Sequence, residues 1–394
     1  MTLLPVPEAL ARLLALAPAL ETEQAPLLAA LDRTLAAPIH ATRTQPAADL
    51  SAMDGYALRF AELRQPLTVT GEAAAGVAPF AIAPGHAARI FTGGAVPDGA
   101  DVVLIQEEAI RDGDRLTLGG EGPPAPGAHI RRKGSDFTTG DLLLPAGTVV
   151  TPAVVALAAA AGHALLPVLR RPRIVILSTG DELVPPGTPA TGIQLPSSNA
   201  PMLAALLARL PVEVQDRGIV RDDLPTLTAA FRDAAAWADI IVTTGGASVG
   251  DHDLVRPALV AAGAEIDFWR LALKPGKPLM AGHIGATVAL GLPGNPISAY
   301  VTALLFLLPL AARLAGADHL LPPPETMPLA TPLPATGPRR EYVRAADREG
   351  AACPLTGQDS AALRRLPEAA VLVLRDAHSP PAVAGAMVTV VRIA

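Results

Sequence analysis

Cysteine and aromatic residues are scarce in this sequence, and positive charge does not predominate. The single cysteine, Cys353, excludes an internal disulfide and any cysteine-rich zinc site. This cysteine usage is typical of the reducing cytoplasm, where we expect the protein to reside. The formal net charge of −6 argues against nucleic acid as a partner, because nucleic-acid binding needs a basic surface.

The sequence also lacks a hydrophobic run typical of a membrane span or a signal peptide. Residues 1–20 are apolar, but they contain Pro5 and Pro7 and no basic leader, so they predict a surface helix. Residues 299–312 are shorter than a bilayer span and contain Pro309, so they predict a helix buried in a core. We therefore expect no association with a membrane.

Length and composition predict several domains with well-packed cores. A chain of 394 residues exceeds one ordinary core and indicates about two to four domains. Half of the residues are hydrophobic, which argues against disorder. The predicted fold class is multidomain α/β, with an N-terminal helical linking domain (1–50 and 140–170), an inserted β-rich domain (51–139), an α/β domain (171–318) and a small C-terminal β domain (319–394).

The outer parts of the chain give simple patterns. Residues 1–44 carry leucines at helical spacing, such as Leu10, Leu13, Leu27 and Leu31, and predict helices. The segments 67–70, 88–91, 102–105 and 115–118 predict strands, because Gly and Pro separate short apolar runs. Near the C-terminus, the proline-rich stretch 322–338 predicts a linker, and strands are expected at 370–374 and 387–393.

Two stretches of the second half share one pattern, a buried strand followed by Thr, Gly and acidic residues. Residues 240–242 are β-branched and lead into a loop at 243–253, and residues 174–177 lead into a loop at 178–182. The alternation of strands and helices up to Gly316 predicts a doubly wound parallel sheet. Both loops should then lie at the same sheet edge, where ligands bind. The competing interpretation is that Thr, Gly and Asp serve only as turn residues.

Three further loops belong to the same domain. Lys274 and Lys277 lie on a stiff turn of Pro and Gly that follows Arg270. Residues 290–298 form a rigid turn that opens the long apolar helix, whose first N–H groups can bind an anion. Residues 197–201 are predicted to cap another helix. Lysines on loops are usually solvated. Lys274 and Lys277 are therefore candidate binding residues only because their loop is expected at the same sheet edge as the other loops.

The N-terminal half contains three polar loops with a simple local explanation. Asp54 lies within 51–57, Thr92 follows a predicted strand, and Asp136 follows three consecutive cations at 131–133. Asp54 can accept hydrogen bonds from a turn, and the cations can protect a strand edge from pairing. Taken one by one, these loops do not require a ligand.

Taken in order, the loops resemble the molybdopterin molybdenumtransferase family, called MoeA in bacteria and represented by the gephyrin E domain. The resemblance covers nearly the whole chain and rests on segments in register at 51–57, 92–101, 178–183, 243–253, 274–278 and 292–298. It implies a MogA-like doubly wound α/β domain, a small C-terminal β-barrel domain, and a homodimer with a shared active site. It also implies Mg²⁺-dependent insertion of molybdate into adenylylated molybdopterin, with release of AMP and molybdenum cofactor.

The resemblance assigns roles to residues by position. Catalytic roles fall on acidic and hydroxyl side chains, namely Asp54, Thr92, Asp136, Glu182, Asp222 and Asp253. Among these, Glu182 and Asp253 are the expected ligands of Mg²⁺, which prefers oxygen. Substrate binding falls on Thr244, Gly245, Gly246, Ser248, Arg270, Lys274, Lys277, Pro293, Asn295 and Pro296. Acids would hold the metal against phosphates, and cations would neutralise the remaining charge of the phosphates and molybdate.

The sequence departs from the family pattern at several positions. Arg270 stands where a lysine is common, Ser135 replaces a frequent acid, and Leu254 replaces a frequent aromatic residue. Arg364 and Arg365 occupy a C-terminal stretch that serines usually line. The resemblance therefore assigns no site residue to the C-terminal domain.

Three other functions compete with this interpretation. A MogA-type molybdopterin adenylyltransferase would share the α/β domain, but it would not need residues 51–57 or the C-terminal β domain. A tungstate-inserting paralogue would differ little in sequence, because tungstate and molybdate are both tetrahedral dianions. A non-enzymatic scaffold, the additional role of the gephyrin E domain, is disfavoured by the retained acids. Other molybdenum-cofactor biosynthesis proteins are expected as further partners.

Overall fold

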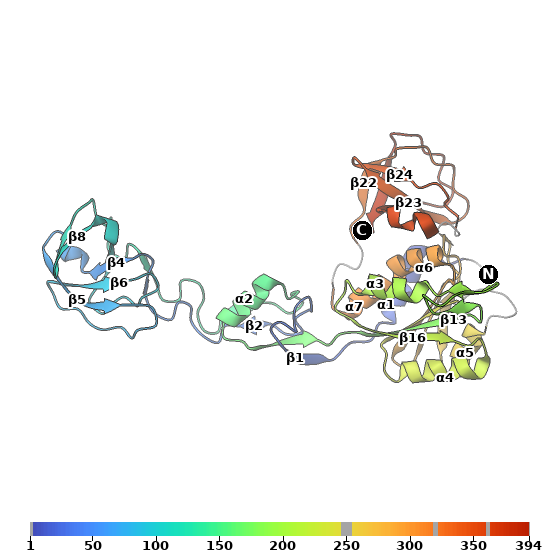
Figure 1. The fold of residues 1–394 in the computed structure, drawn as a ribbon, viewed down its shortest axis with the longest axis horizontal. Coiled ribbons are helices and arrows are strands. Elements are labelled where there is room, and N and C mark those ends of the chain that lie inside the picture. Colours follow the sequence, from blue (N-terminus) through green and yellow to red (C-terminus); the bar gives the residue numbers. More distant parts are fainter. Residues whose placement is uncertain (1–2, 246–253, 318–321, 360–362, 394) are drawn as a thin grey trace. The chain divides into compact units, whose positions relative to one another are not determined.

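The computed structural model describes residues 3–245, 254–317, 322–359 and 363–393 (Figure 1). The chain forms two compact units. Unit 1 contains residues 1–23, 32–36 and 167–394, and unit 2 contains residues 24–31 and 37–166. Unit 2 therefore includes the predicted inserted domain together with most of the region predicted to link it.

Unit 2 is built around a mixed β-sheet, as its sequence predicted. The strand order is β7 (Val102–Ile105), β4 (Gly55–Leu58), β6 (His86–Ile90), β5 (Leu67–Ala73), β9 (Arg115–Leu118) and β8 (Ala109–Asp112). Tyr56, Leu58, Leu104 and Leu116 form part of its core, all of them buried. The predicted strands at 102–105 and 115–118 coincide with β7 and β9.

The rest of unit 2 consists of short elements. These are β2 (Ile39–His40), which pairs with β11 (Leu142–Leu144), β3 (Leu50–Ser51), which pairs with β10 (Ile130–Arg131), the 3-10 turns η1 (Phe60–Glu62) and η2 (Gln106–Glu108), and helix α2 (Pro152–Ala160). Thr151 caps α2, because its Oγ1 accepts a hydrogen bond of 3.3 Å from the N–H of Val154. The helix ends before Gly162, which has a φ of +99°.

Helices were predicted throughout residues 1–44, but only one helix forms in this region, so the prediction was wrong for the rest of it. Helix α1 (Val6–Ala15) forms, but strand β1 (Thr22–Pro26) follows and pairs with β12 (Leu165–Leu169). Residues 27–32 are turns, and the side chain of Leu28 is 81% exposed. The leucine spacing was misleading because Leu28 faces solvent, and a helix without a buried face gains little stability.

The α/β domain of unit 1 contains a mixed sheet. Its strand order is β16 (Glu213–Val220), β13 (Arg173–Thr179), β17 (Ile240–Thr244), β21 (Thr287–Leu292), β20 (Met280–Ile284) and β18 (Glu265–Trp269). The first four strands are parallel, as predicted for a doubly wound sheet, but β20 runs antiparallel to both of its neighbours, β21 and β18, which the sequence did not predict. The cause is local, since a tight turn at residues 285–286 joins β20 to β21 without a crossover helix.

Helices cover both faces of this sheet. Helices α4 (Leu224–Ala235) and α5 (Val255–Ala261) lie on one face, and α3 (Asn199–Leu207), α6 (Pro296–Thr302) and α7 (Leu308–Leu314) lie on the other (Figure 1). Alternate residues of a strand point to opposite faces. Accordingly Val175 and Leu177 pack in the core with α4 and α5, whereas Ile174 and Ile176 pack in the core with α3 and α6.

The apolar run near residue 300 forms a buried helix, as predicted, although a longer one. It extends from Pro296 to Leu314 through a π-helical segment, η3 (Ala303–Leu307). Its length and hydropathy would allow it to cross a membrane, but 78% of its most apolar window is buried inside the protein. Pro309 is accommodated because it lies in the first turn of α7, directly after the π-helical segment.

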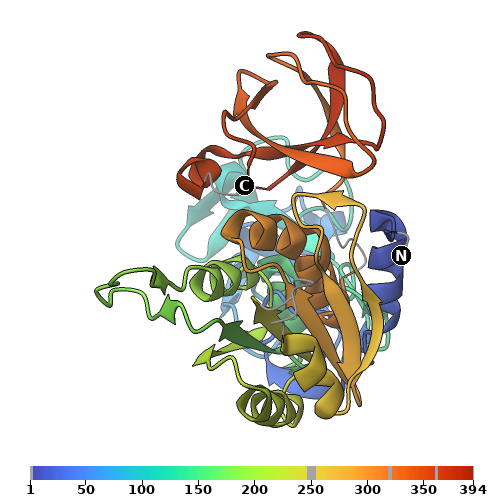
Figure 2. The ribbon, with the colours of Figure 1, turned by 90° about the vertical axis from the view of Figure 1, so that its right-hand side faces the viewer.

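The C-terminal domain is a small β structure, at the top of Figure 2. Its strand order is β19 (Leu273–Lys274), β23 (Arg340–Arg348), β25 (Val371–Arg375), β26 (Met387–Arg392) and β22 (Glu325–Pro328), with β24 (Ala351–Pro354) paired to β23 and the 3-10 segment η4 (Leu363–Glu368) before β25. A bridge between Leu329 and Ala352 joins the end of β22 to β24, which closes β24, β23, β25, β26 and β22 into a ring of strands.

The proline-rich stretch 322–338 is not only a linker, because β22 lies within it. Met327 of β22 is 4% exposed and packs with Val390 of β26. The prolines around it are compatible with an edge strand, where one face of the backbone needs no partner.

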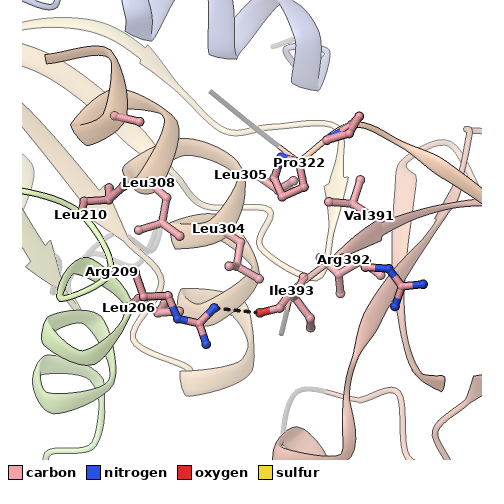
Figure 3. A pocket seen from close by; sticks show the side chains of 13 residues that line it. Leu206, Arg209, Leu210, Leu304, Leu305, Leu308, Pro322, Val391, Arg392 and Ile393 are labelled. Carbon is pink, nitrogen blue, oxygen red and sulfur yellow. Dashed lines mark hydrogen bonds between the residues drawn. The ribbon is translucent and has the colours of Figure 1, made fainter. Parts of the chain in front are cut away.

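An apolar cavity of about 480 Å³ lies where the C-terminal domain meets the α/β domain (Figure 3). Leu206, Leu304 and Leu308 line it from one side, and Val391 and Ile393 line it from the other. None of the described side chains that were predicted for the functional site lines this cavity. It is therefore a feature of domain packing and lies apart from the site described next.

Candidate functional site

The predicted loops of the α/β domain meet at one sheet edge. Strands β13, β17 and β21 are parallel, with Ser178 opposite Thr244 and Thr244 opposite Leu292. Each of these strands ends beside the others, so the loops that follow them are neighbours. The prediction that the two Thr-Gly loops share an edge is confirmed.

A small cavity of about 130 Å³ lies at this edge. Four predicted residues line it: Glu182, Thr244, Gly245 and Pro296. Side chains and backbone that were not predicted also line it, namely Thr179, Leu183, Leu195, Pro196, Ser197, Ser198, Asn199 and Gly294. The short strands β14 (Leu183–Val184) and β15 (Leu195–Pro196) form one wall.

Gly245 is required by the geometry of the cavity wall. Its φ is +94°, and an added Cβ would lie 2.3 Å from the carbonyl oxygen of Thr179. Its Cα is also 3.3 Å from the Cβ position of Gly294. Glycine at 245 therefore lets three chain segments approach one another closely.

Asn295 and the two prolines shape the loop after β21. The Oδ1 of Asn295 accepts hydrogen bonds from the N–H groups of Ile297 (3.1 Å) and Ser298 (3.2 Å), which makes it the N-cap of α6. Pro296 occupies the first turn of that helix and Pro293 is buried. Asn295 thus has a structural role as the N-cap of α6, and it is not among the residues that line the cavity.

The segment 197–199 was missed as a functional segment, because the sequence predicted only a helix cap there. Helix α3 begins at Asn199, and the preceding Ser198 makes no capping hydrogen bond through its side chain. Instead, Asn199 donates from Nδ2 to the carbonyl oxygen of Gly294 over 2.7 Å. No local pattern could reveal this contact, because the partners are 95 residues apart.

Asp222 lies in an acidic environment after β16. Its N–H donates to Oδ1 of Asp181 over 3.2 Å. Burial raises the pKa of Asp222, and repulsion from Asp181, Glu182 and Asp223 raises it further. Its Oδ1 is buried and has no hydrogen-bond partner among the residues that the structure describes. A nearby cation would offset both costs.

The raised pKa of Asp222 leads to a prediction about stability. A folded-state pKa above the unfolded-state value means that stability falls as pH rises through that interval. Asp222→Asn removes the charge, so we expect its melting temperature at pH 7 to exceed that of wild type by a few degrees. The gain should shrink towards about pH 4, where the wild-type carboxylate becomes protonated. Thermal unfolding across this pH range is the measurement.

Asp223→Asn is the matched control for this prediction. Hydrogen bonds from Thr226 lower the pKa of Asp223, so its charge is favourable in the folded state. We therefore expect no gain in melting temperature from Asp223→Asn at pH 7. Equal melting temperatures for Asp222→Asn and wild type at pH 7 would contradict the account of Asp222.

Two predicted residues of unit 2 contact each other directly. The Oδ1 of Asp54 accepts hydrogen bonds from the N–H (2.7 Å) and the Oγ1–H (2.8 Å) of Thr92. These bonds, with the charge of Arg89, lower the pKa of Asp54 and keep it ionised. The simple interpretation of Asp54 as a turn residue is incomplete, because its partner lies 38 residues away. Asp136 is exposed on the loop between β10 and β11.

The predicted cations lie on a loop that contacts the C-terminal domain through an ion pair and a strand pairing. The Nζ of Lys274 forms an ion pair of 2.9 Å with Oε1 of Glu341, and β19 pairs with β23 in the same register. Lys277 is exposed. Arg270 adopts a φ of +88°, which is uncommon for a residue with a side chain. None of these three cations lines the 130 Å³ cavity.

Three predicted residues, Gly246, Ser248 and Asp253, lie outside the described residues. Within the described part of the chain, no group of three or more His, Cys, Asp or Glu side chains is arranged to hold a metal ion. Glu182 and the acids near it supply oxygen donors of the kind that Mg²⁺ prefers, but a complete site needs a further ligand.

Comparison with known proteins first shows which class of protein has this fold. A family model described as the MoeA N-terminal region (domain I and II) matches residues 4–162, and one described as a probable molybdopterin binding domain matches residues 175–313. Two solved structures of the molybdopterin biosynthesis MoeA protein from Pyrococcus horikoshii are 28% identical to this chain, cover at least 99% of it and of themselves, and have TM-scores of 0.86 and 0.80. The fold is thus that of a MoeA-type protein, whose α/β domain coincides with the molybdopterin-binding family model.

Relatives of known name identify the family. The molybdopterin molybdenumtransferase of Nostoc sp. is 40% identical over 307 residues, which cover 75% of this chain and 70% of the relative. The enzyme of the same name from Haemophilus influenzae is 38% identical and covers 79% of this chain and 77% of the relative. The chain belongs to the molybdopterin molybdenumtransferase family.

Proposed function

We propose that the protein inserts molybdate into adenylylated molybdopterin and releases AMP and molybdenum cofactor. The observation that supports this most is the convergence of Glu182, Thr244, Gly245 and Pro296 on one cavity at the carboxyl edge of the sheet. A site of this kind offers an acid, a hydroxyl group and small residues to one ligand at the edge where α/β sheets bind ligands. The test is AMP release from adenylylated molybdopterin in the presence of molybdate.

The residues predicted for the site would have different roles in binding the substrate, according to their charge. Lys274, Lys277 and Arg270 would neutralise the phosphates and molybdate. Glu182 with Asp253 would hold Mg²⁺, and Asp222 would add negative charge nearby. When bound, Mg²⁺ polarises the phosphorus centre and screens the phosphate oxygens. Asp54, Thr92 and Asp136 complete the proposed catalytic set.

We further propose that the enzyme acts as a cytoplasmic homodimer. The family resemblance supports an arrangement in which Asp54, Thr92 and Asp136 of one subunit serve the α/β domain of the other. A two-fold dimer would then contain two equivalent sites. Other molybdenum-cofactor biosynthesis proteins are the proposed further partners, because the cofactor must be passed on.

The alternative functions give different products. A MogA-type adenylyltransferase would consume ATP and adenylylate molybdopterin, so incubation of the protein with these two compounds separates the functions. A tungstate-inserting enzyme would release AMP with tungstate and little with molybdate. Titration of both oxyanions against AMP release distinguishes these enzymes.

Lys274 provides a prediction about binding. Its ammonium group is half-exposed and uses one of its three donors on Glu341. If it also contacts an anionic part of the substrate, Lys274→Gln should weaken binding of adenylylated molybdopterin about tenfold or more. Wild-type affinity should fall with added salt, and that of the variant should fall less. Isothermal titration at two ionic strengths measures both effects.

Arg348→Gln is the control for this prediction. Arg348 is an exposed cation at the far end of β23, the strand that carries Glu341. Its loss changes the net charge of the protein by the same amount as the loss of Lys274. We expect it to bind the substrate like wild type. If Lys274→Gln and Arg348→Gln bind with equal affinity and equal salt dependence, Lys274 lies outside the site.

A further inference from the structure

The carboxamide of Asn199 has one polar end fixed and the other available. Asn199 is 8% exposed, and it lines the 130 Å³ cavity at the sheet edge. Its Nδ2 donates to the carbonyl oxygen of Gly294 over 2.7 Å, which fixes the orientation of the group. Its Oδ1 is buried and has no hydrogen-bond partner within the described part of the chain.

An amide oxygen in this state is uncommon. Buried polar atoms almost always have a partner, because their removal from water is otherwise uncompensated. An acceptor that is kept buried and fixed beside a cavity is therefore a candidate for recognising a ligand donor.

The other polar groups of the cavity indicate what kind of ligand fits. Two hydroxyl groups of the lining already have partners: Ser197 shares a hydrogen bond of 3.2 Å with Ser178, which lies outside the lining, and Thr179 donates its hydroxyl proton to the carbonyl oxygen of Thr244 over 3.3 Å. Glu182 contributes a carboxylate to the lining, which can only accept when ionised. Oδ1 of Asn199 and the carboxylate of Glu182 are therefore acceptors that the lining presents. The cavity suits N–H donors and disfavours phosphate oxygens, which are themselves anionic acceptors.

The size of the cavity also limits which part of a ligand can enter it. At about 130 Å³ it is well below the roughly 300–1,000 Å³ of pockets that enclose a whole ligand. It is suited to one ring system at the end of a larger molecule.

We infer that Asn199 accepts a hydrogen bond from a ring or amino N–H of the substrate's pterin and so helps to select molybdopterin. This inference rests on the proposed function. In this arrangement the neutral, donor-rich pterin occupies the cavity that presents these acceptors, and the anionic groups of the substrate face the lysine loop. Asn199 is then a specificity residue that does not take part in the transfer of molybdenum.

The test is the affinity of Asn199→Ala for three ligands measured by isothermal titration: molybdopterin, adenylylated molybdopterin and AMP. Loss of one hydrogen bond should weaken binding of the two pterin ligands about tenfold. Binding of AMP, which has no pterin, should not change. In steady-state assays the variant should show a raised KM for adenylylated molybdopterin and a nearly unchanged kcat.

Thr287→Ala is the matched control. Thr287 is 5% exposed and its Oγ1 donates to the carbonyl oxygen of Ala238 over 2.7 Å. It starts β21, at the opposite end of the strand from the cavity, so its replacement also removes a buried hydrogen bond to the backbone but touches no ligand. We expect wild-type affinities for all three ligands.

Asn199→Asp keeps the test valid if the alanine variant does not fold. A protonated carboxyl group can donate to Gly294 and accept from the pterin, whereas the ionised form cannot donate. An ordinary aspartate is ionised above about pH 5, so at pH 7 this variant keeps the acceptor for the pterin and loses only the donor to Gly294. It should therefore bind molybdopterin more tightly than Asn199→Leu, which lacks the acceptor, and equal affinities of the two variants would overturn the inference.

The outcomes separate the inference from the proposed function. If wild type neither binds nor converts adenylylated molybdopterin, the proposed function fails. If wild type is active and Asn199→Ala binds molybdopterin equally well, only the inference fails. An equal loss of affinity for AMP and molybdopterin also overturns it, because Asn199 would then only tether the loop at Gly294.

Discussion

Asp54→Asn is expected to lower the rate of AMP release on the order of a hundredfold, with the protein still folded. Asparagine keeps an oxygen that can accept the N–H and Oγ1–H of Thr92, which bond Oδ1 of Asp54 in the wild type. The substitution therefore removes mainly the negative charge, which these bonds stabilise. Loss of one preorganised electrostatic group in an active site typically has an effect of this size. Single-turnover AMP release and thermal unfolding are the measurements.

Asp141→Asn is the control for Asp54→Asn. The Oδ2 of Asp141 also accepts a backbone N–H, from Thr138 over 2.7 Å, and Asp141 is an exposed acid of the same unit. It lies outside the proposed catalytic set, so AMP release should stay near the wild-type rate. If Asp54→Asn also releases AMP at a near wild-type rate, Asp54 has no role in catalysis.

Mixing two inactive variants is expected to restore about a quarter of wild-type activity. If each site combines Asp54 of one subunit with Glu182 of the other, a hybrid of Asp54→Ala and Glu182→Ala subunits has one site with both lesions and one with neither. With free exchange, about half of the dimers are hybrids, and each has one intact site of two. Activity is followed as the two purified variants are mixed in equal amounts.

Two controls make this experiment decisive. Subunit exchange is verified with differently tagged chains, and mixing each variant with itself should restore nothing. If exchange is complete and no activity returns, each site is formed within one subunit, because every site in every hybrid would then retain one lesion. That result would contradict the shared site and leave the proposed reaction untouched.

The parts of the site that the sequence predicted depend on local chemistry. The β-branched run at 240–242, followed by Thr244 and Gly245, defines a buried strand and a tight turn within a few residues. The same holds for β13 and the loop with Glu182. Because parallel strands end at a common edge, these two local patterns were enough to place both loops together.

The parts that the sequence did not predict depend on contacts between distant residues. The hydrogen bond from Asn199 to Gly294 spans 95 positions, and the ion pair of Lys274 with Glu341 spans 67. No periodicity links such partners. The capping pattern at 197–201 has a purely local explanation, so the buried acceptor of Asn199 could be found only in three dimensions.

The wrong predictions about the fold also concern segments whose structure depends on contacts with distant residues. Leucines at 27, 28 and 31 follow a helical spacing, but whether such a stripe forms a helix depends on a core to pack against, and Leu28 is exposed. Prolines suggested a linker at 322–338, yet Met327 packs into the C-terminal core and makes β22 a strand. Propensity describes the chain alone, and tertiary packing overrides it in both places.

AMP release from adenylylated molybdopterin tests the central proposal most directly. The purified protein is incubated with adenylylated molybdopterin and Mg²⁺, with molybdate either added or omitted, and AMP and molybdenum-bound cofactor are quantified. The proposal predicts that AMP appears in step with molybdenum cofactor and that both depend on molybdate. Folded protein that releases no AMP, or that instead adenylylates molybdopterin at the expense of ATP, would contradict it.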